Sequence, residues 1–140
     1  MSSNAMTPAR PASPPSSLLA FDFGSKRIGV AKGLALLQSA EPLRAITVSG
    51  DARFVAIEKL IRDWQPDALV VGVPFHPDGA EHEMTLAARR FGRQLKGRFR
   101  LPVYEVDERY TSVEAESMGA RDVDSTAAAL ILEQFFREHA

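Results

Sequence analysis

The strongest constraint on the fold lies near the start of the chain, where two apolar segments flank a short polar turn. The segments are Leu18–Phe23 and Ile28–Ala31, and the turn is Gly24–Arg27. Two apolar runs joined in this way predict a β-hairpin. The first predicted strand contains an acid, Asp22, and a carboxylate in a core strand is costly unless a metal ion or a hydrogen-bond donor compensates it. Asp22 is therefore a candidate functional residue, and the alternative is that it caps its own turn.

The chain after the hairpin alternates between strand and helix patterns. β-branched runs predict strands, and apolar residues at three-and-four spacing predict helices. Since helices separate the later strands, these strands are expected to pair in parallel. We therefore expect an α/β fold with one mixed five-stranded sheet, three antiparallel strands followed by two parallel ones, and helices on both faces. The expected elements are strands over Leu43–Val48 (opened by Pro42), Asp67–Val73 and Pro102–Asp107, and helices over Ala52–Trp64, Glu83–Phe99, Thr111–Met118 and Val123–His139.

The first 17 residues differ in composition from the rest of the chain. Met1–Ser17 is rich in Pro, Ser and Ala and has almost no large apolar residues, which predicts a disordered leader. Within it, Ser3–Ala5 directly precedes Met6 and is typical of a cloning remnant. We expect the remainder, residues 18–140, to form a single domain, since a chain of 140 residues is long enough for one core.

Composition excludes several classes of function. Cysteine is absent, which excludes disulfides, thiolate zinc sites and cysteine nucleophiles and fits a reducing cytoplasm. No apolar run reaches the roughly 20 residues of a membrane-spanning helix, so no membrane role is expected. The formal net charge is −1, so any binding of nucleic acid must depend on a local basic patch.

Acidic residues recur where predicted strands end and helices begin. Asp22 lies near the end of the first strand, Asp107 and Glu108 at the end of the fifth, and Asp124 at the start of the last helix. A central first strand would bring them together as oxygen ligands for Mg²⁺. Alternation places Asp107 and Glu108 on opposite faces, so only one of them is expected beside Asp22, and which one stays open. As alternatives, Asp124 could stabilise its helix and Asp107 or Glu108 could pair with Arg109.

Four motifs together resemble the YqgF/RuvX family of pre-16S rRNA nucleases and Holliday-junction-resolvase-like proteins. In chain order they are FDFGSKRIGVA, VVGVPFHPDGAE, VYEVDERYTSVEAE and VDSTAAALIL. The similarity extends from about Leu18 to Phe136. The resemblance implies a ribonuclease H-like fold and a nuclease that acts on structured nucleic acid, chiefly in 5′-end maturation of pre-16S rRNA. A resolvase role in DNA recombination is the alternative.

The resemblance also implies the site residues and the cofactor. It assigns catalysis and metal binding to Asp22, Glu108 and Asp124, with Asp22 shared between two ions of Mg²⁺ or Mn²⁺. Two such ions about 4 Å apart activate the attacking water and stabilise the leaving oxygen. The chain departs from the family pattern at Ser25, where Thr is commoner, and at Tyr110, where Leu is commoner. Neither change removes a catalytic group.

Basic residues are the candidates for contacts with the substrate. Lys26, Arg27 and Arg109 follow the acids closely and are expected to contact phosphates. A second candidate is a cluster on the second long helix, whose alternative is a solvated helix face. The members of this cluster are Arg89, Arg90, Arg93, Lys96, Arg98 and Arg100.

Three further residues have a structural and a functional interpretation. His76 and His82 flank a turn and could assist proton transfer, or be plain surface residues. Trp64 continues the apolar stripe of its helix and is expected to belong to the core rather than to stack on a base.

Two other classes of function compete with a nuclease. The segment Asp22–Lys26 also resembles the first phosphate loop of the actin and sugar-kinase superfamily, but 140 residues are too few for the two lobes that close around ATP. A non-catalytic nucleic-acid-binding factor in assembly of the small ribosomal subunit is the other alternative. The expected partner is nucleic acid, either pre-rRNA or branched DNA, and the ribosomal small-subunit precursor is a further candidate. The chain is expected to be a monomer or a homodimer.

Overall fold

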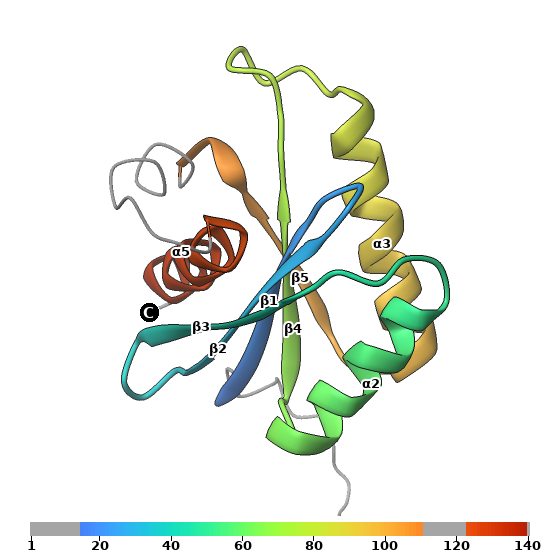
Figure 1. Cartoon of the computed structure of the whole chain (residues 1–140). Coiled ribbons are helices and arrows are strands. Elements are labelled where there is room, and N and C mark those ends of the chain that lie inside the picture. The colour runs from blue at the N-terminus through green and yellow to red at the C-terminus, as the bar shows by residue number, and fades with distance from the viewer. Residues whose placement is uncertain (1–14, 111–122, 140) are drawn as a thin grey trace, which may run out of the picture.

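The computed structural model describes residues 15–110 and 123–139 (Figure 1). In these residues, five strands form one sheet with the order β3-β2-β1-β4-β5. The strands are β1 Ser17–Phe23, β2 Ile28–Leu34, β3 Ser39–Ile46, β4 Ala68–Val73 and β5 Val103–Asp107. The described helices are α2 Ala52–Trp64, α3 Glu83–Phe99 and α5 Val123–Glu138, and Glu108–Tyr110 forms a 3₁₀ turn, η1.

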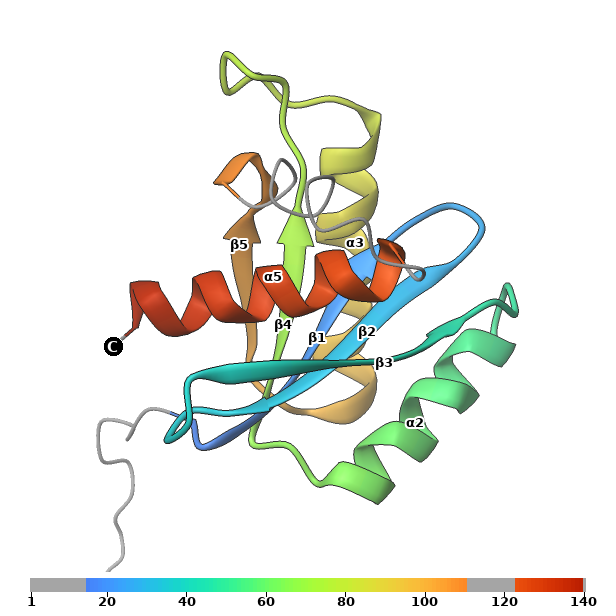
Figure 2. The same cartoon turned by 60° about the vertical axis from the view of Figure 1, so that its left-hand side comes forward.

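The sheet is mixed, and its central strand is β1. β1 pairs antiparallel with β2, and β2 pairs antiparallel with β3. On its other side β1 pairs parallel with β4, which in turn pairs parallel with β5. α5 crosses one face of the sheet, and α2 and α3 lie on the other (Figures 1 and 2). The predicted five-stranded mixed sheet with helices on both faces is confirmed.

Alternation along β1 determines which way its acid points. Phe21 and Phe23 both pack against Phe91 of α3, with ring centroids 6.0 Å and 4.7 Å away. Ala20 belongs instead to the apolar cluster that includes Ile131 of α5. Since neighbouring residues of a strand point to opposite faces, the side chain of Asp22 lies on the α5 side of the sheet.

The third strand begins earlier than predicted. It starts at Ser39 rather than after Pro42, and β2 extends to Leu34. Among the described strands β3 pairs only with β2, so it is an edge strand, where a proline that cannot donate to the ladder is tolerated. Half of the residues of β3 are exposed, so its sequence lacks the apolar alternation that would have marked its start.

The prediction that Trp64 belongs to the core is wrong. Its side chain is 43% exposed, and the Lys32 ammonium lies 4.3 Å from the centroid of its ring. Burial decreases along α2, because Phe54 and Ile57 are buried whereas Ile61 is only half-buried. Trp64 therefore continues the apolar period of the helix but is not buried in the core.

The start of the sheet lies within the segment expected to be leader. β1 begins at Ser17, and the backbone amides of Ser16 and Ser17 donate hydrogen bonds to the Asp67 carboxylate at 2.8 Å and 3.1 Å. The rest of the expected leader, residues 1–14, and the helix expected over Thr111–Met118 lie outside the described residues. Among the helices that the structure describes, none has the length and apolar character needed to cross a membrane.

Candidate active site

Two of the three predicted acids meet at one end of the sheet. Asp22 lies near the end of β1, and Glu108 opens η1 directly after β5. The two carboxyl groups share a hydrogen bond. Burial of Glu108, followed by the negative charge of Asp22, raises the pKa of Glu108 to about 8. Near neutral pH, Glu108 therefore holds the proton that joins the two groups.

A glycine in β4 makes room for this pair. A Cβ atom on Gly72 would lie 2.8 Å from Oε2 of Glu108 and closer still to Cδ1 of Ile131 in α5. Both distances are shorter than a real Cβ contact allows, so any larger residue would displace one of the two side chains. This close approach accounts for a glycine in a strand that otherwise consists of Ala, Leu and Val.

The neighbouring acid, Asp107, has a different partner. Its carboxylate accepts hydrogen bonds from Arg109 Nη2 at 2.7 Å, Nε at 3.0 Å and the backbone amide at 2.9 Å. Burial disfavours the Asp107 carboxylate, but these Arg109 hydrogen bonds outweigh it, and the pKa of Asp107 lies below its usual value. Glu108 is thus the acid that contacts Asp22, while Asp107 makes the pair with Arg109. Strand alternation could not decide between them, because the strand ends at Asp107 and the chain turns at Glu108.

The third predicted acid, Asp124, is the second residue of α5, and its side chain lies outside the described residues. The position of its backbone is set by the next residue. The Ser125 hydroxyl is buried and accepts a hydrogen bond from the Val30 amide at 3.4 Å. Val30 follows Gly29, the residue that pairs with Asp22 across β1 and β2. The start of α5 therefore lies against the same end of the hairpin as the acid pair.

The chemistry of the acid pair fits a hard divalent cation. Asp22 and Glu108 supply two candidate ligands. Within the described residues, no group of three or more Asp, Glu, His or Cys side chains is arranged to hold a metal ion. Two carboxyl groups held together under partial burial do not both ionise near neutral pH unless a positive charge compensates them. A divalent cation with oxygen ligands provides this charge.

The basic residues predicted near the acids differ in their surroundings. Lys26 and Arg27 are exposed on the turn that follows Asp22. The Arg109 guanidinium is held by Asp107, reaches the Pro77 carbonyl at 3.4 Å and lies 5.6 Å from the Phe75 ring centroid. Arg109 therefore fastens the loop after β4 to the end of β5, beside the acids.

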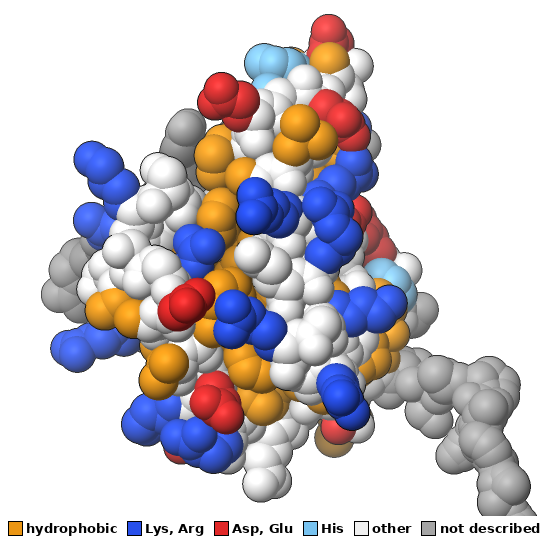
Figure 3. Space-filling view, turned by 90° about the vertical axis from the view of Figure 1, so that its right-hand side faces the viewer, with side chains coloured by type: hydrophobic (Ala, Val, Ile, Leu, Met, Phe, Trp, Pro, Cys, Tyr) orange, Lys and Arg blue, Asp and Glu red, His pale blue; other side chains and the backbone are white. Residues whose placement is uncertain are grey.

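The basic cluster of α3 does not act as one unit. Figure 3 shows lysine and arginine side chains spread over the face that α2 and α3 form. Arg89 pairs with Glu81 and Glu105, and Arg98 lies 3.6 Å from Asp51. Arg90 and Arg93 instead line a pocket together with residues of β1 and α2. Lys96 and Arg100 are exposed near the end of the helix.

Two functional features were missed by the sequence analysis. Arg53 on α2 lines the same pocket as Arg90 and Arg93, and a single arginine at the start of a helix carries no signal of that role. Gly72 did have a signal, since it interrupts a continuous β-branched run.

His82 has a structural role, because its Nδ1 accepts a hydrogen bond from the Met84 amide at the start of α3, and its ring lies 4.7 Å from that of His76.

Comparison with known proteins agrees with this geometry. A solved structure of T. thermophilus RuvC in complex with a Holliday junction substrate superposes with a TM-score of 0.59 at 15% identity, covering 88% of this chain and 95% of that one. At this identity the likeness shows the fold alone, which is ribonuclease H-like as the motifs implied.

Relatives at much higher identity carry a functional name. A protein of Albidiferax ferrireducens named as a pre-16S rRNA nuclease is 66% identical over 119 residues, 85% of this chain and 76% of the relative. A protein of Ralstonia pickettii with the same name is 52% identical, over 95% of this chain and 98% of the relative. The model of the RuvX family, described as Holliday junction resolvase, matches residues 16–138. The chain belongs to the RuvX family.

Proposed function

We propose that this protein is a divalent-metal-dependent nuclease that cleaves structured RNA, with the 5′ end of pre-16S rRNA as its substrate in the cytoplasm. The observation that carries the proposal is the hydrogen-bonded pair of Asp22 and Glu108 at the end of the central strand. Relatives up to 66% identical are named as nucleases of this RNA. The small-subunit precursor is the partner that this substrate implies.

Asp22, Glu108 and Asp124 are the residues that would hold the metal. The metal would be two ions of Mg²⁺ or Mn²⁺. When bound, such ions activate the attacking water and stabilise the leaving oxygen. Glu108 has to release its proton before both carboxylates can serve as ligands, because its pKa of about 8 leaves it protonated near neutral pH. The cation and the proton therefore compete for the same pair of oxygens.

The basic residues beside the acids would orient the substrate. Lys26 and Arg27 lie on the turn after Asp22 and would neutralise phosphates next to the scissile bond. Arg109 would contribute a further contact while it remains bound to Asp107. Arg89 and Arg93, on α3, would contact the substrate further from the acids.

The test is cleavage of a pre-16S 5′-leader RNA and of a four-way DNA junction, side by side with Mn²⁺. Wild type is compared with Asp22→Asn and with Asp63→Asn, a matched control on the exposed face of α2. We expect RNA cleavage by wild type and Asp63→Asn and none by Asp22→Asn. Cleavage that is equal in all three proteins would contradict the role of Asp22.

Junction resolution is the second candidate function, since the family model is described as Holliday junction resolvase. Cleavage of the junction alone, again lost in Asp22→Asn, would establish it. A resolvase cuts two strands symmetrically and would act as a homodimer, whereas the RNA nuclease can act as a monomer. If the protein binds RNA but shows no cleavage that is lost in Asp22→Asn, a non-catalytic assembly factor would be favoured.

A further inference from the structure

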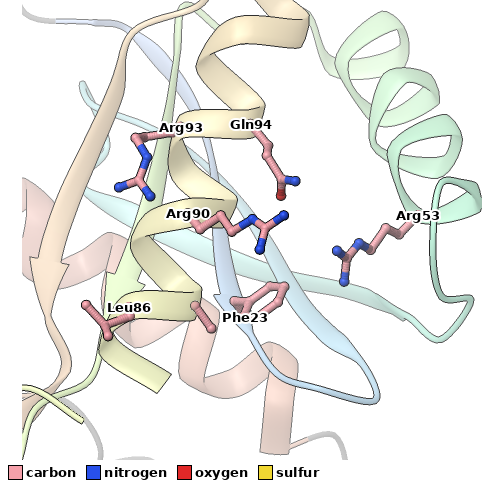
Figure 4. A pocket seen from close by; sticks show the side chains of 7 residues that line it. Phe23, Arg53, Leu86, Arg90, Arg93 and Gln94 are labelled. Atoms are coloured by element: carbon pink, nitrogen blue, oxygen red, sulfur yellow. The ribbon is translucent and has the colours of Figure 1, made fainter. Parts of the chain in front are cut away.

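A basic pocket of about 500 Å³ lies on the face of the sheet opposite to the acid pair. It is formed between α3 and the start of α2, over the end of β1 (Figure 4). Its lining contains three arginines and no acid. Its lining includes Phe23, Arg53, Leu86, Arg90, Arg93 and Gln94.

The arginines of this pocket differ from other arginines on the same helix. Arg89 and Arg98 of α3 are each paired with a carboxylate. Arg90 and Arg93 form no ion pair with any described residue of the chain. The positive charge of the pocket is therefore not neutralised by the part of the protein that the structure describes.

The arrangement of Arg53 and Arg90 calls for an anion. Figure 4 shows their guanidinium groups pointing toward one another beside the ring of Phe23. Nε of Arg53 is buried and has no hydrogen-bond partner among the described residues, and leaving a buried N–H without an acceptor is costly. Two cations that face each other also repel. An anion between them would remove the repulsion and supply acceptors.

The pocket is suited to the phosphate backbone rather than to a base. One face of the Phe23 ring is stacked on Phe91, with centroids 4.7 Å apart, and the Arg53 guanidinium lies over the ring at 5.4 Å. The ring is thus already packed and does not offer a platform for a base. Guanidinium groups match the paired oxygens of a phosphate, and the amide of Gln94 can donate a further hydrogen bond.

We propose that Arg53, Arg90, Arg93 and Gln94 form a phosphate-binding site that anchors a flanking strand of the nucleic-acid substrate, away from the bond that is cut. The inference rests on the proposed function, because it assumes that nucleic acid is the substrate. Phe23 directly follows Asp22 and faces the other side of the sheet. A strand that occupies both sites must therefore pass over the turn that carries the exposed Lys26.

The test measures binding without cleavage, in EDTA, by fluorescence anisotropy of the labelled 5′-leader RNA over a series of salt concentrations. The double variant Arg90→Gln/Arg93→Gln is compared with Arg62→Gln/Arg137→Gln. The control removes the same charge from two exposed arginines that do not line the pocket. Arg90 and Arg93 are themselves exposed, so both doubles are expected to fold, and circular dichroism verifies this.

We expect the pocket double variant to bind about tenfold more weakly near 0.1 M salt, and the slope of log affinity against log salt to fall by about 1 to 2. The control should match wild type, and Arg90→Lys/Arg93→Lys should restore the salt slope because it keeps the charge. Equal affinity of the two glutamine doubles, or no binding of RNA by wild type, would overturn the inference.

A free nucleotide is the other source of the same phosphate chemistry, and uridine monophosphate is the probe for it. A melting temperature raised by the nucleotide in wild type but not in Arg90→Gln/Arg93→Gln, with RNA binding equal in both, would overturn the strand anchor. Since the binding assay needs no turnover, its result is independent of the cleavage assay. Absent cleavage together with weakened binding in the pocket variant would contradict only the proposed nuclease activity.

Discussion

At the scale of single residues, the site depends on one proton shared between two carboxyl groups. Burial and the Asp22 charge raise the pKa of Glu108 to about 8, whereas hydrogen bonds from three nitrogen atoms of Arg109 lower the pKa of Asp107 and keep it ionised. Two adjacent acids in one motif therefore differ in charge near neutral pH. This difference separates a candidate metal ligand from a residue that positions an arginine.

The raised pKa predicts that the metal-free protein loses stability as the pH rises. Between the ordinary value of 4.5 and the folded value of about 8, the folded state holds one more proton than the unfolded state. Glu108→Gln removes this dependence, so we expect it to be more stable than wild type by roughly 4 kcal/mol near pH 8 and by less than about 1 kcal/mol near pH 5. Urea unfolding in EDTA measures both. The exposed Glu58→Gln should follow wild type, and a Glu108→Gln curve parallel to wild type would refute the assignment.

Gly72 provides a second prediction at this scale. An alanine methyl group would collide with Ile131 and with Glu108, so Gly72→Ala should lower the free energy of unfolding by about 1–3 kcal/mol. Gly97 is the matched control, since a Cβ there meets nothing within 4 Å and lies in α3. Gly97→Ala should stabilise the protein by up to about 1 kcal/mol. Urea midpoints measure both changes, and a shift of both variants in the same direction would contradict the prediction.

At the scale of elements, the sequence predicted α2 and α3 with the bounds that the structure shows, because an apolar stripe at helical spacing is a signal over many residues. β3 was misplaced since an exposed edge strand carries little such signal. Strand alternation alone predicted the meeting of Asp22 and Glu108 only as one of two choices, because the contact depends on the turn at η1, and it was the family resemblance that assigned Glu108. The pocket of Arg53 and Arg90 depends on how two helices approach, which no local pattern contains.

The first strand is fastened by an acid that follows α2. The Asp67 carboxylate accepts hydrogen bonds from the amides of Ser16 and Ser17, and these bonds hold the pKa of Asp67 below its usual value. Asp67→Ala should cost about 1 kcal/mol of stability near neutral pH. Since the folded pKa is lowered, this contribution is lost as the pH falls through it, and variant and wild type should converge in acid. Urea unfolding of Asp67→Ala and of the control Asp63→Ala tests this, and equal losses at neutral pH would contradict it.

At the scale of the whole molecule, the sheet separates two sites of opposite charge. The acid pair lies on the α5 side of β1, and the pocket of Arg53, Arg90 and Arg93 lies on the side of α2 and α3. β1 contributes to both sites, because the side chains of its consecutive residues Asp22 and Phe23 point to opposite faces of the sheet. We therefore expect the acid pair to bind a cation whether or not the arginine pocket holds a phosphate, and the reverse.

Independent binding can be measured through melting temperatures. A cation that binds only the folded state stabilises it by RT ln(1 + [L]/Kd), about 1.4 kcal/mol at tenfold excess over Kd, or roughly 2–6 °C. We expect Mn²⁺ to raise the melting temperature of wild type, of Asp63→Asn and of Arg90→Gln/Arg93→Gln, but not of Asp22→Asn. The shift should grow from about pH 6 to pH 8, because the Glu108 proton competes with the ion. A shift that persists in Asp22→Asn would place the cation elsewhere, and a shift lost in the pocket variant would show that the two faces are coupled.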